Sequence, residues 1–419
     1  MKKHFWRNHP LIEILRNNKG NPRVQLLMEP LWGIPFNLIA PFATIYMYRQ
    51  GIEDIQIGTI LSIAMFVQVF FAFFGGIITD KLGRKKATMM GDICGWSIAC
   101  LVWAISDNFW LFLIAALFNC FEYVNQTAWF CLLIEDADPK DLVGLYTGAM
   151  MAGLLAVFFA PISGFLINTY DVVPVVRVLY VIFAVNMMIK AILTWRFCRE
   201  TKQGQIRREE TKGVPLKTML GEYKGLLSMI TGNKEVIKAI AIYVILHIVN
   251  MTNGAFFGLY VTQRLGIAES YLAFFPILNA SVMLVFMVFL QHRLDKLKLR
   301  VPLRGGFILS AACALLLIMT PMENIFLLVI YIFIGAVAGA LVGPRNHALL
   351  QLNIDIGERA RINSMIVTFT IAFSSPFGFL VGWLSRNDRR LPFALIILLL
   401  MAAIVIVGKI REPERVEEK

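Results

Sequence analysis

Charged residues are scarce in this chain, and so are the residue patterns with which enzymes build catalytic or metal centres. Asp, Glu, Lys and Arg make up 16% of the 419 residues, whereas a soluble domain has about a quarter. The five histidines and six cysteines show neither metal-ligand spacing nor a pairing pattern. The sequence contains no Gly-rich phosphate loop ending in Lys-Ser/Thr and no nucleophile elbow. We therefore expect no enzyme, no metal site, no cofactor and no ATP hydrolysis.

Apolar side chains, in contrast, are abundant. They account for 58% of the chain, and the mean hydropathy is +0.67. Only helices and closed barrels satisfy their backbone polar groups in lipid, and a helix requires about 20 apolar residues to cross. Runs of that length recur, so the sequence predicts an all-α membrane protein with twelve transmembrane helices, or eleven if the short ninth run fails. The predicted spans are 24–48, 57–79, 87–105, 109–133, 142–167, 172–195, 236–261, 271–290, 303–319, 325–349, 363–384 and 391–407.

Basic residues predict the orientation, because short loops rich in Lys and Arg stay on the cytoplasmic side. If both termini are cytoplasmic, six of the 40 Lys and Arg residues lie outside: Arg49, Arg177, Arg264, Arg386, Arg389 and Arg390. The net charge of +12 then reflects orientation in the bilayer and not nucleic-acid binding. We expect an integral protein of the plasma (inner) membrane.

The chain divides near its middle. We expect a cytoplasmic segment (1–23), a first six-helix bundle (24–195), a basic linker with an amphipathic helix (196–235), a second bundle (236–407) and a cytoplasmic tail (408–419). Weak repeats support a duplication. Asp80-Lys81-Leu82 recurs as Asp295-Lys296-Leu297, and Asp136 has a counterpart in Asp355, at similar offsets.

The turn between the second and third predicted spans carries the most specific pattern. It matches Gly-x-x-x-Asp-Arg/Lys-x-Gly-Arg-Arg/Lys at Gly76, Asp80, Lys81, Gly83, Arg84 and Lys85. On these residues the chain resembles a major facilitator superfamily transporter over nearly its whole length. The resemblance implies two pseudo-symmetric six-helix bundles around a central cavity that opens alternately to each side of the membrane. It says almost nothing about the substrate.

We expect this turn to act in a cytoplasmic gate. Gly76 is expected to let a neighbouring helix approach closely, and Gly83 to adopt a positive φ. Asp80 is expected to accept backbone hydrogen bonds from a helix N-terminus in the other half, which the resemblance assigns to the eleventh helix. Arg84 and Lys85 are expected to reach Glu135 or Asp136. The alternative is that these basic residues only determine topology.

Further gating candidates lie at the same predicted membrane surface. Asp92 is assigned to the charge cluster around Arg84 because it lies about one turn into the third predicted span. A matching gate in the second half is expected from Asp295, Lys296, Arg345, Asp355 and Arg359.

Polar residues inside the spans are candidates for binding the substrate or a proton, since such groups are costly in lipid and usually face a cavity or a partner. They are Glu29 and Asn37 in the first span, Glu122, Asn125, Gln126 and Trp129 in the fourth, and His247 and Asn250 in the seventh. Burial disfavours a charged carboxylate, so Glu29 or Glu122 is expected to exchange a proton. The alternative for Glu122 is a hydrogen bond between helices.

These features predict a secondary active transporter of a small organic solute, coupled to protons, with efflux slightly favoured over uptake. An uptake permease for a sugar or similar nutrient is the first alternative. A non-transporting sensor or lipid-handling protein on the same scaffold is the second. The expected partners are the solute, protons and the lipid bilayer, with no nucleic acid, and the protein is expected to be a monomer.

Overall fold

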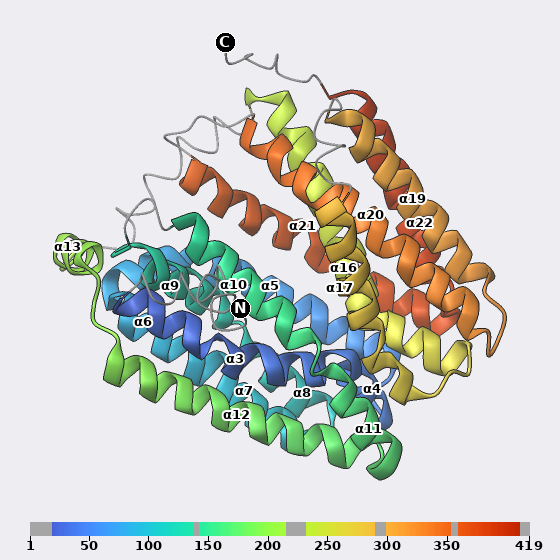
Figure 1. Ribbon diagram of the computed structural model, residues 1–419, viewed down its shortest axis with the longest axis horizontal. Coiled ribbons are helices and arrows are strands. Elements are labelled where there is room, and N and C mark those ends of the chain that lie inside the picture. Colours follow the sequence, from blue (N-terminus) through green and yellow to red (C-terminus); the bar gives the residue numbers. More distant parts are fainter. Residues whose placement is uncertain (1–18, 138–141, 215–231, 290–298, 353–358, 411–419) are drawn as a thin grey trace, which may run out of the picture. The chain divides into compact units, whose positions relative to one another are not determined.

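The computed structural model describes residues 19–137, 142–214, 232–289, 299–352 and 359–410, and every regular element in these ranges is helical (Figure 1). Within them, 11 helices are long and apolar enough to cross a membrane. The fold is therefore the all-α membrane architecture that the sequence predicts. The short ninth run does form a helix, α19 (Arg300–Met319).

The first half of the chain forms the helices of the first six predicted spans. They are α3 (Asn21–Ile39), η1 (Ala40–Phe42) and α4 (Ala43–Arg49); α5 (Asp54–Leu82); α6 (Arg84–Met90), η2 (Gly91–Ile98) and α7 (Ala99–Ile105); α8 (Phe109–Asn119) and α9 (Glu122–Ile134); α10 (Leu142–Val157) and α11 (Ala160–Tyr170); and α12 (Val172–Phe197), followed by the short α13 (Lys202–Glu210).

The second half forms the remaining helices. They are α16 (Lys234–Leu259) with η4 (Tyr260–Arg264), η5 (Glu269–Ala273) with α17 (Phe275–Phe289), α19, α20 (Ile325–Leu352), α21 (Arg359–Asn387) and α22 (Leu391–Gly408). The amphipathic helix expected in the linker, at 216–230, lies outside the described residues, as do Asp295, Lys296 and Asp355.

Two interruptions of the spans follow from proline. Pro41 lies in η1, the 3₁₀ turn between α3 and α4, and Pro161 lies at the start of α11. Proline has no N–H to donate and its ring displaces the carbonyl of the preceding turn, so a helix restarts around it. Pro30 and Pro35 lie inside the continuous α3.

The fourth predicted span is divided without a proline. Cys120 and Phe121 form a tight turn in which their N–H groups donate to Leu117 and Phe118, three residues back, as in a 3₁₀ helix. The neighbouring η2 is a π-helix, and a Cβ at its Gly95 would lie 2.9 Å from the Glu122 nitrogen. This close contact holds the turn at Cys120 and Phe121 in place. The fourth predicted span therefore consists of two helices, α8 and α9, each too short to cross a membrane alone.

The described residues group into two compact units. Unit 1 draws on Met1–Gly51 and Val67–Met219, and unit 2 on Ile52–Phe66 and Leu220–Lys419. The single helix α5 therefore begins in unit 2 and ends in unit 1. Many large apolar side chains are exposed, including Trp110 (68%), Phe165 (67%) and Phe326 (70%). Exposure of this extent suits contact with lipid and not with water.

Candidate functional site

The glycine-broken turn between α5 and α6 is held by an acid from a distant part of the chain. Gly83 has φ +86°, which confirms the predicted positive φ, and it directly precedes α6. The Glu200 carboxylate accepts hydrogen bonds from the backbone N–H groups of Arg84 (2.8 Å) and Lys85 (3.2 Å). A carboxylate at this position satisfies the first free N–H groups of a helix and complements its dipole. Glu200 was not among the predicted site residues.

The side chain of Arg84 joins two acids beneath this turn. Its guanidinium lies 2.7 Å from Asp80 and 3.0 Å from Glu135, and only 6% of the side chain is exposed. The predicted contact between Arg84 and Glu135 is therefore confirmed. Charge-assisted pairs of this kind are short and directional, and their burial limits screening by salt.

Asp80 has a second basic partner that the sequence did not suggest. Arg207, on α13, donates to the Asp80 carboxylate at 3.1 and 3.2 Å. Partial burial lowers the pKa of Arg207, but Asp80 and Glu210 outweigh this effect and raise that pKa, so the guanidinium stays charged. Within unit 1, the side chain of Asp80 is contacted by Arg84 and Arg207.

The first turn of α13 is anchored on the same cluster. Thr201 caps the helix by accepting from the Gly204 N–H (2.9 Å), and its hydroxyl donates to Glu135 (2.5 Å). A Cβ at Gly204 would lie 2.9 Å from the side chain of Arg84, so only glycine fits here. We call Asp80, Arg84, Glu135, Glu200, Thr201 and Arg207 the inner network.

The remaining predicted gating residues of unit 1 lie around the inner network. A Cβ at Gly76 would meet nothing within 4 Å, whereas one at Gly75 would lie 3.4 Å from a backbone oxygen of α9. Within unit 1, α9 therefore passes close to Gly75 and not to Gly76, and the close approach expected at Gly76 stays a prediction. Lys81 donates to the Val214 carbonyl (3.0 Å). Lys85 does not pair with an acid in the described contacts but lies 4.6 Å from the ring centre of Trp195.

Asp136 and Asp92 are both placed away from Arg84. Asp136 accepts from the Lys202 backbone N–H (3.2 Å) and from Asn21 (3.4 Å). Asp92, which we assigned to the Arg84 cluster, instead accepts from Asn125 (2.7 Å) and from Lys190 (3.4 Å). The physical reason is depth: the third helix begins at Arg84 and not at residue 87, so Asp92 lies two turns inside it.

Asp92, Lys190 and Asn125 form a polar site deep inside unit 1, which we call the buried charge site. Asp92 is 0% exposed, Lys190 3% and Asn125 6%. One oxygen of Asp92 and the amide oxygen of Asn125 have no hydrogen-bond partner. Glu29, on α3, interacts electrostatically with both Lys190 and Asp92. Two acids thus share a single base in apolar surroundings.

The other polar residues predicted on α3 and α9 do not form one stripe. Asn37 donates to the Gly33 carbonyl of its own helix (2.8 Å). Gln126 is exposed, while Trp129 packs against a buried cluster of Leu26, Leu133 and Leu145. Glu122 begins α9 and is partly buried.

Predicted residues of unit 2 are placed as follows. His247 is partly buried with no partner for Nδ1, and Asn250 is exposed on the same helix, α16. Arg345 is buried on α20 and donates to the Leu341 carbonyl (3.1 Å). Arg359 begins α21, but its side chain lies outside the described part of the chain.

A close helix crossing in unit 2 was missed by the sequence analysis. A Cβ at Gly58 of α5 would lie 2.8 Å from Gly382 of α21, and one at Gly378 would lie 2.7 Å from the Ser62 hydroxyl. Ser62 also bridges the backbones, because it donates to the Ser375 carbonyl (2.5 Å) and accepts from the Phe379 N–H (2.6 Å). Small residues that admit such an approach are common between membrane helices.

An ion pair lies at the same end of this crossing. Arg389 is 3.1 Å from Asp54, which is 5% exposed and also accepts from Ser385 (2.6 Å). The sequence signals were present but weak: glycines and serines spaced along α5 and α21, and one lysine, Lys190, within a long apolar run.

Comparisons with known proteins agree with this architecture. Residues 32–378 match the family model described as Major Facilitator Superfamily. The chain is 26% identical over 367 residues to the multidrug resistance protein MdtG of Yersinia enterocolitica, covering 84% of this chain and 83% of that protein. It is 25% identical over 216 residues to the multi-drug resistance efflux pump PmrA of Streptococcus pneumoniae, spanning 51% of that protein.

Among solved structures, the nucleoside transporter NupG has the same fold. The TM-score is 0.71 at 13% sequence identity, and the alignment covers 94% of this chain and 100% of that one. At this identity the likeness concerns the fold alone.

Proposed function

Since this chain belongs to the Major Facilitator Superfamily, and is therefore a secondary transporter and not an enzyme, we propose that it exports a small organic solute in exchange for protons. The observation that carries the proposal is the buried charge site. Asp92 and Glu29 share one lysine within unit 1, and an unbalanced charge buried in apolar surroundings is costly. A proton on one of the two acids would balance that charge, so the site is suited to bind and release one.

The direction of transport is proposed from the relatives. MdtG is described as a multidrug resistance protein and PmrA as an efflux pump, and the former alignment extends over most of both chains. We extend this to the present chain as export of an organic solute across the plasma membrane. Uptake of a nutrient is the competing outcome of the test below.

We propose that the conformational change involves both ends of α5. At its end in unit 1, the inner network holds Asp80 on Arg84 and Arg207. At its beginning in unit 2, Gly58 and Ser62 contact α21. Opening one side of the membrane and closing the other requires such contacts to form and break in alternation. The two bundles at 24–195 and 236–407 are the proposed moving bodies.

The topology is proposed from the basic residues: both termini and the basic linker are cytoplasmic, and the protein acts as a monomer. A cytoplasmic location of the linker suits the inner network, whose Glu200, Thr201 and Arg207 belong to it. Labelling single cysteines introduced at positions 107 and 210, in a variant whose six native cysteines are replaced by serine, with a membrane-impermeant maleimide in intact cells tests this. Position 107 should be labelled and position 210 should not.

The function is tested in a host whose own efflux pumps are deleted. Cells expressing the wild-type protein are compared against a panel of amphiphilic dyes and antibiotics, with and without an uncoupler that collapses the proton gradient. We expect raised resistance to some compounds, lost with the uncoupler and in Asp92→Asn. The matched control is Asp107→Asn, which alters an exposed acid of the same unit and should retain resistance.

Three results decide between the candidate functions. Resistance that persists with the uncoupler would refute proton coupling. Accumulation of a sugar or nucleoside, with no resistance to any compound of the panel, would favour the uptake permease. Counterflow of a labelled solute in proteoliposomes would exclude the sensor, because a receptor binds its ligand without flux.

A further inference from the structure

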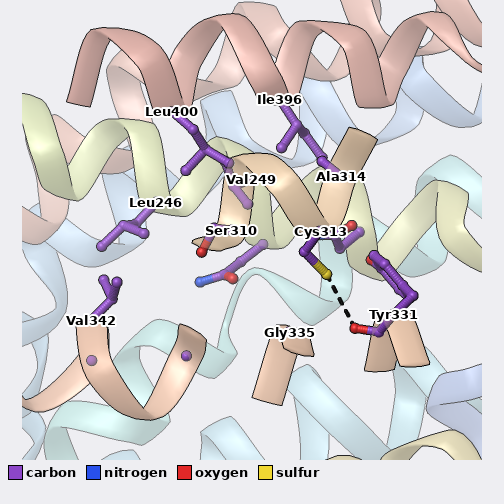
Figure 2. A pocket seen from close by; sticks show the side chains of 14 residues that line it. Leu246, Val249, Ser310, Cys313, Ala314, Tyr331, Gly335, Val342, Ile396 and Leu400 are labelled. Carbon is purple, nitrogen blue, oxygen red and sulfur yellow. Dashed lines mark hydrogen bonds between the residues drawn. The ribbon is translucent and has the colours of Figure 1, made fainter. Parts of the chain in front are cut away.

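A cavity of about 230 Å³ lies among helices of unit 2. Of the candidate site residues discussed above, Asn250 lines it. Its walls come from α16, α19, α20 and α22. Figure 2 shows Leu246 and Val249 on one side, Val342 below them, and Ile396 and Leu400 above. None of the described residues that line it is charged. A charged group placed there would lose its water without gaining a counter-ion, which is strongly unfavourable.

Glycines make one wall of the cavity. Gly335, Gly339 and Gly343 recur every four residues and therefore follow one face of α20. Between membrane helices this spacing normally marks close packing. Here a Cβ at Gly339 or Gly343 would meet nothing within 4 Å, and one at Gly335 would only touch the Cys313 sulfur at 3.5 Å. No described helix therefore packs closely against these glycines, and the space beside them is part of the cavity.

Some polar groups of the cavity wall have hydrogen-bond partners within the protein, and a buried one does not. The Cys313 thiol donates to the Tyr331 carbonyl (3.1 Å; Figure 2), and the Ser310 hydroxyl donates to Gly306 (2.9 Å). Asn253, in contrast, has a buried amide oxygen with no partner. A buried acceptor of this kind is costly unless a donor reaches it. Among the described residues that line the cavity, Asn253 thus offers a buried acceptor that a donor of the occupant can fill, beside the apolar side chains of Leu246, Val249, Val342, Ile396 and Leu400.

We infer that this cavity binds the uncharged apolar part of the transported solute, with a hydrogen-bond donor of that solute at Asn253. A dry apolar cavity of about 150 Å³ holds one benzene ring, so 230 Å³ suits a group of about two fused rings. Stacking of Phe257 on Tyr331, with ring centres 5.5 Å apart, stiffens the aromatic end of the wall. The inference rests on the proposed function in that the occupant is part of the exported solute.

Binding is measured on the purified full-length protein in detergent, with empty micelles as the blank. The probe is radiolabelled 2-naphthol, a neutral two-ring compound with one hydroxyl donor, in equilibrium dialysis. Unlabelled naphthalene, which has no donor, and naphthalene-2-sulfonate, which is an anion, serve as competitors. We expect saturable binding of 2-naphthol, competition by naphthalene about five-fold weaker as one net hydrogen bond implies, and no competition by the sulfonate.

The variants fill the cavity or remove its acceptor. Gly339→Leu should weaken binding at least ten-fold, and Gly343→Val provides a second filling variant should the first not fold. Gly305→Leu is the control, because Gly305 is exposed on α19 and a Cβ there also meets nothing within 4 Å; it should bind like the wild type. Asn253→Ala should remove the preference for 2-naphthol over naphthalene.

Three outcomes would overturn the inference: no saturable binding by the wild type, equal binding by the folded filling variants, or equal competition by the sulfonate. A lipid chain that co-purifies with the wild type and is lost in Gly339→Leu, detected by native mass spectrometry, would overturn it in favour of lipid. Resistance in cells separates this inference from the proposed function. If the cells are resistant but Gly339→Leu binds 2-naphthol as well as the wild type does, the inference about the cavity is refuted. If Gly339→Leu weakens binding but the wild type confers no resistance, only the proposed function is refuted.

Discussion

Removing the positive charge from the buried charge site should destabilise the protein more than removing a shorter ion pair that is partly open to solvent. Lys190 and Asp92 are 3.4 Å apart, with side chains 4% and 0% exposed. At an effective dielectric constant of about 20 their attraction is about 5 kcal/mol, and removing one member of a buried pair typically costs about 3–5 kcal/mol. Lys190→Met leaves Asp92 with Asn125 as its remaining described donor.

The expected change in melting temperature follows from the chain length. An unfolding entropy of about 2.1 cal/mol/K per residue over 419 residues converts this loss into a fall of about 3–6 °C. Thermal unfolding in detergent, followed by the loss of the monodisperse peak in size-exclusion chromatography, measures it. The double variant Lys190→Met/Asp92→Asn removes both charges and should recover most of the loss, as a double-mutant cycle requires of a coupled pair.

Lys238→Met is the control. Lys238 lies only 2.7 Å from Glu235 and donates to the Lys409 carbonyl (2.7 Å). Its side chain and that of Glu235 are 28% and 20% exposed, and pairs that solvent reaches are worth about 0–1 kcal/mol. Its melting temperature should stay within about 1 °C of the wild type. An equal fall in both lysine variants, or a double variant whose loss is the sum of the single ones, would refute the reasoning from burial.

Three further predictions concern the two ends of α5. Asp80→Asn should insert and purify normally but lose most transport, and normal flux would exclude a gating role. Arg207→Ala should change the melting temperature by no more than about 1 °C, because the Arg207 side chain is 39% exposed and such pairs contribute little; a larger fall would show that α13 is a structural support. Gly378→Leu should abolish transport or folding because its side chain would collide with Ser62, whereas Gly153→Leu, where a Cβ meets nothing within 4 Å, should be tolerated in a fluorescence-detected size-exclusion assay.

Hydropathy predicted the helices well because length and apolar content are local properties of the sequence. The interruptions at Pro41 and Pro161 coincide with a local signal, a proline, but Pro30 and Pro35 lie inside the continuous α3, so a proline alone does not say where a helix is interrupted. The joint at Cys120 and Phe121 was not predictable in this way. It depends on Gly95, which lies on another helix and brings a backbone against the start of α9.

In the candidate site, too, contacts that depend on local sequence could be predicted, and contacts between distant helices could not. Arg84 and Glu135 could be connected from the sequence because a recognisable turn and the end of a predicted span bring them together, whereas the pairing of Asp80 with Arg84 was not predicted. Lys190 could not be paired from sequence, since its partner Asp92 lies 98 positions earlier in a different helix. A lone lysine in an apolar run signals that a partner exists without saying which one.

The helix α5 sets a mechanical limit on how this protein can move. It is 29 residues long without an internal proline, a rod of about 43 Å, and one end is packed in each unit. Such a rod transmits a tilt from one end to the other without absorbing it. We therefore expect a molecule that stabilises the Gly58 crossing to change the affinity of the inner network for its own partners, and by linkage we expect the reverse effect to the same degree.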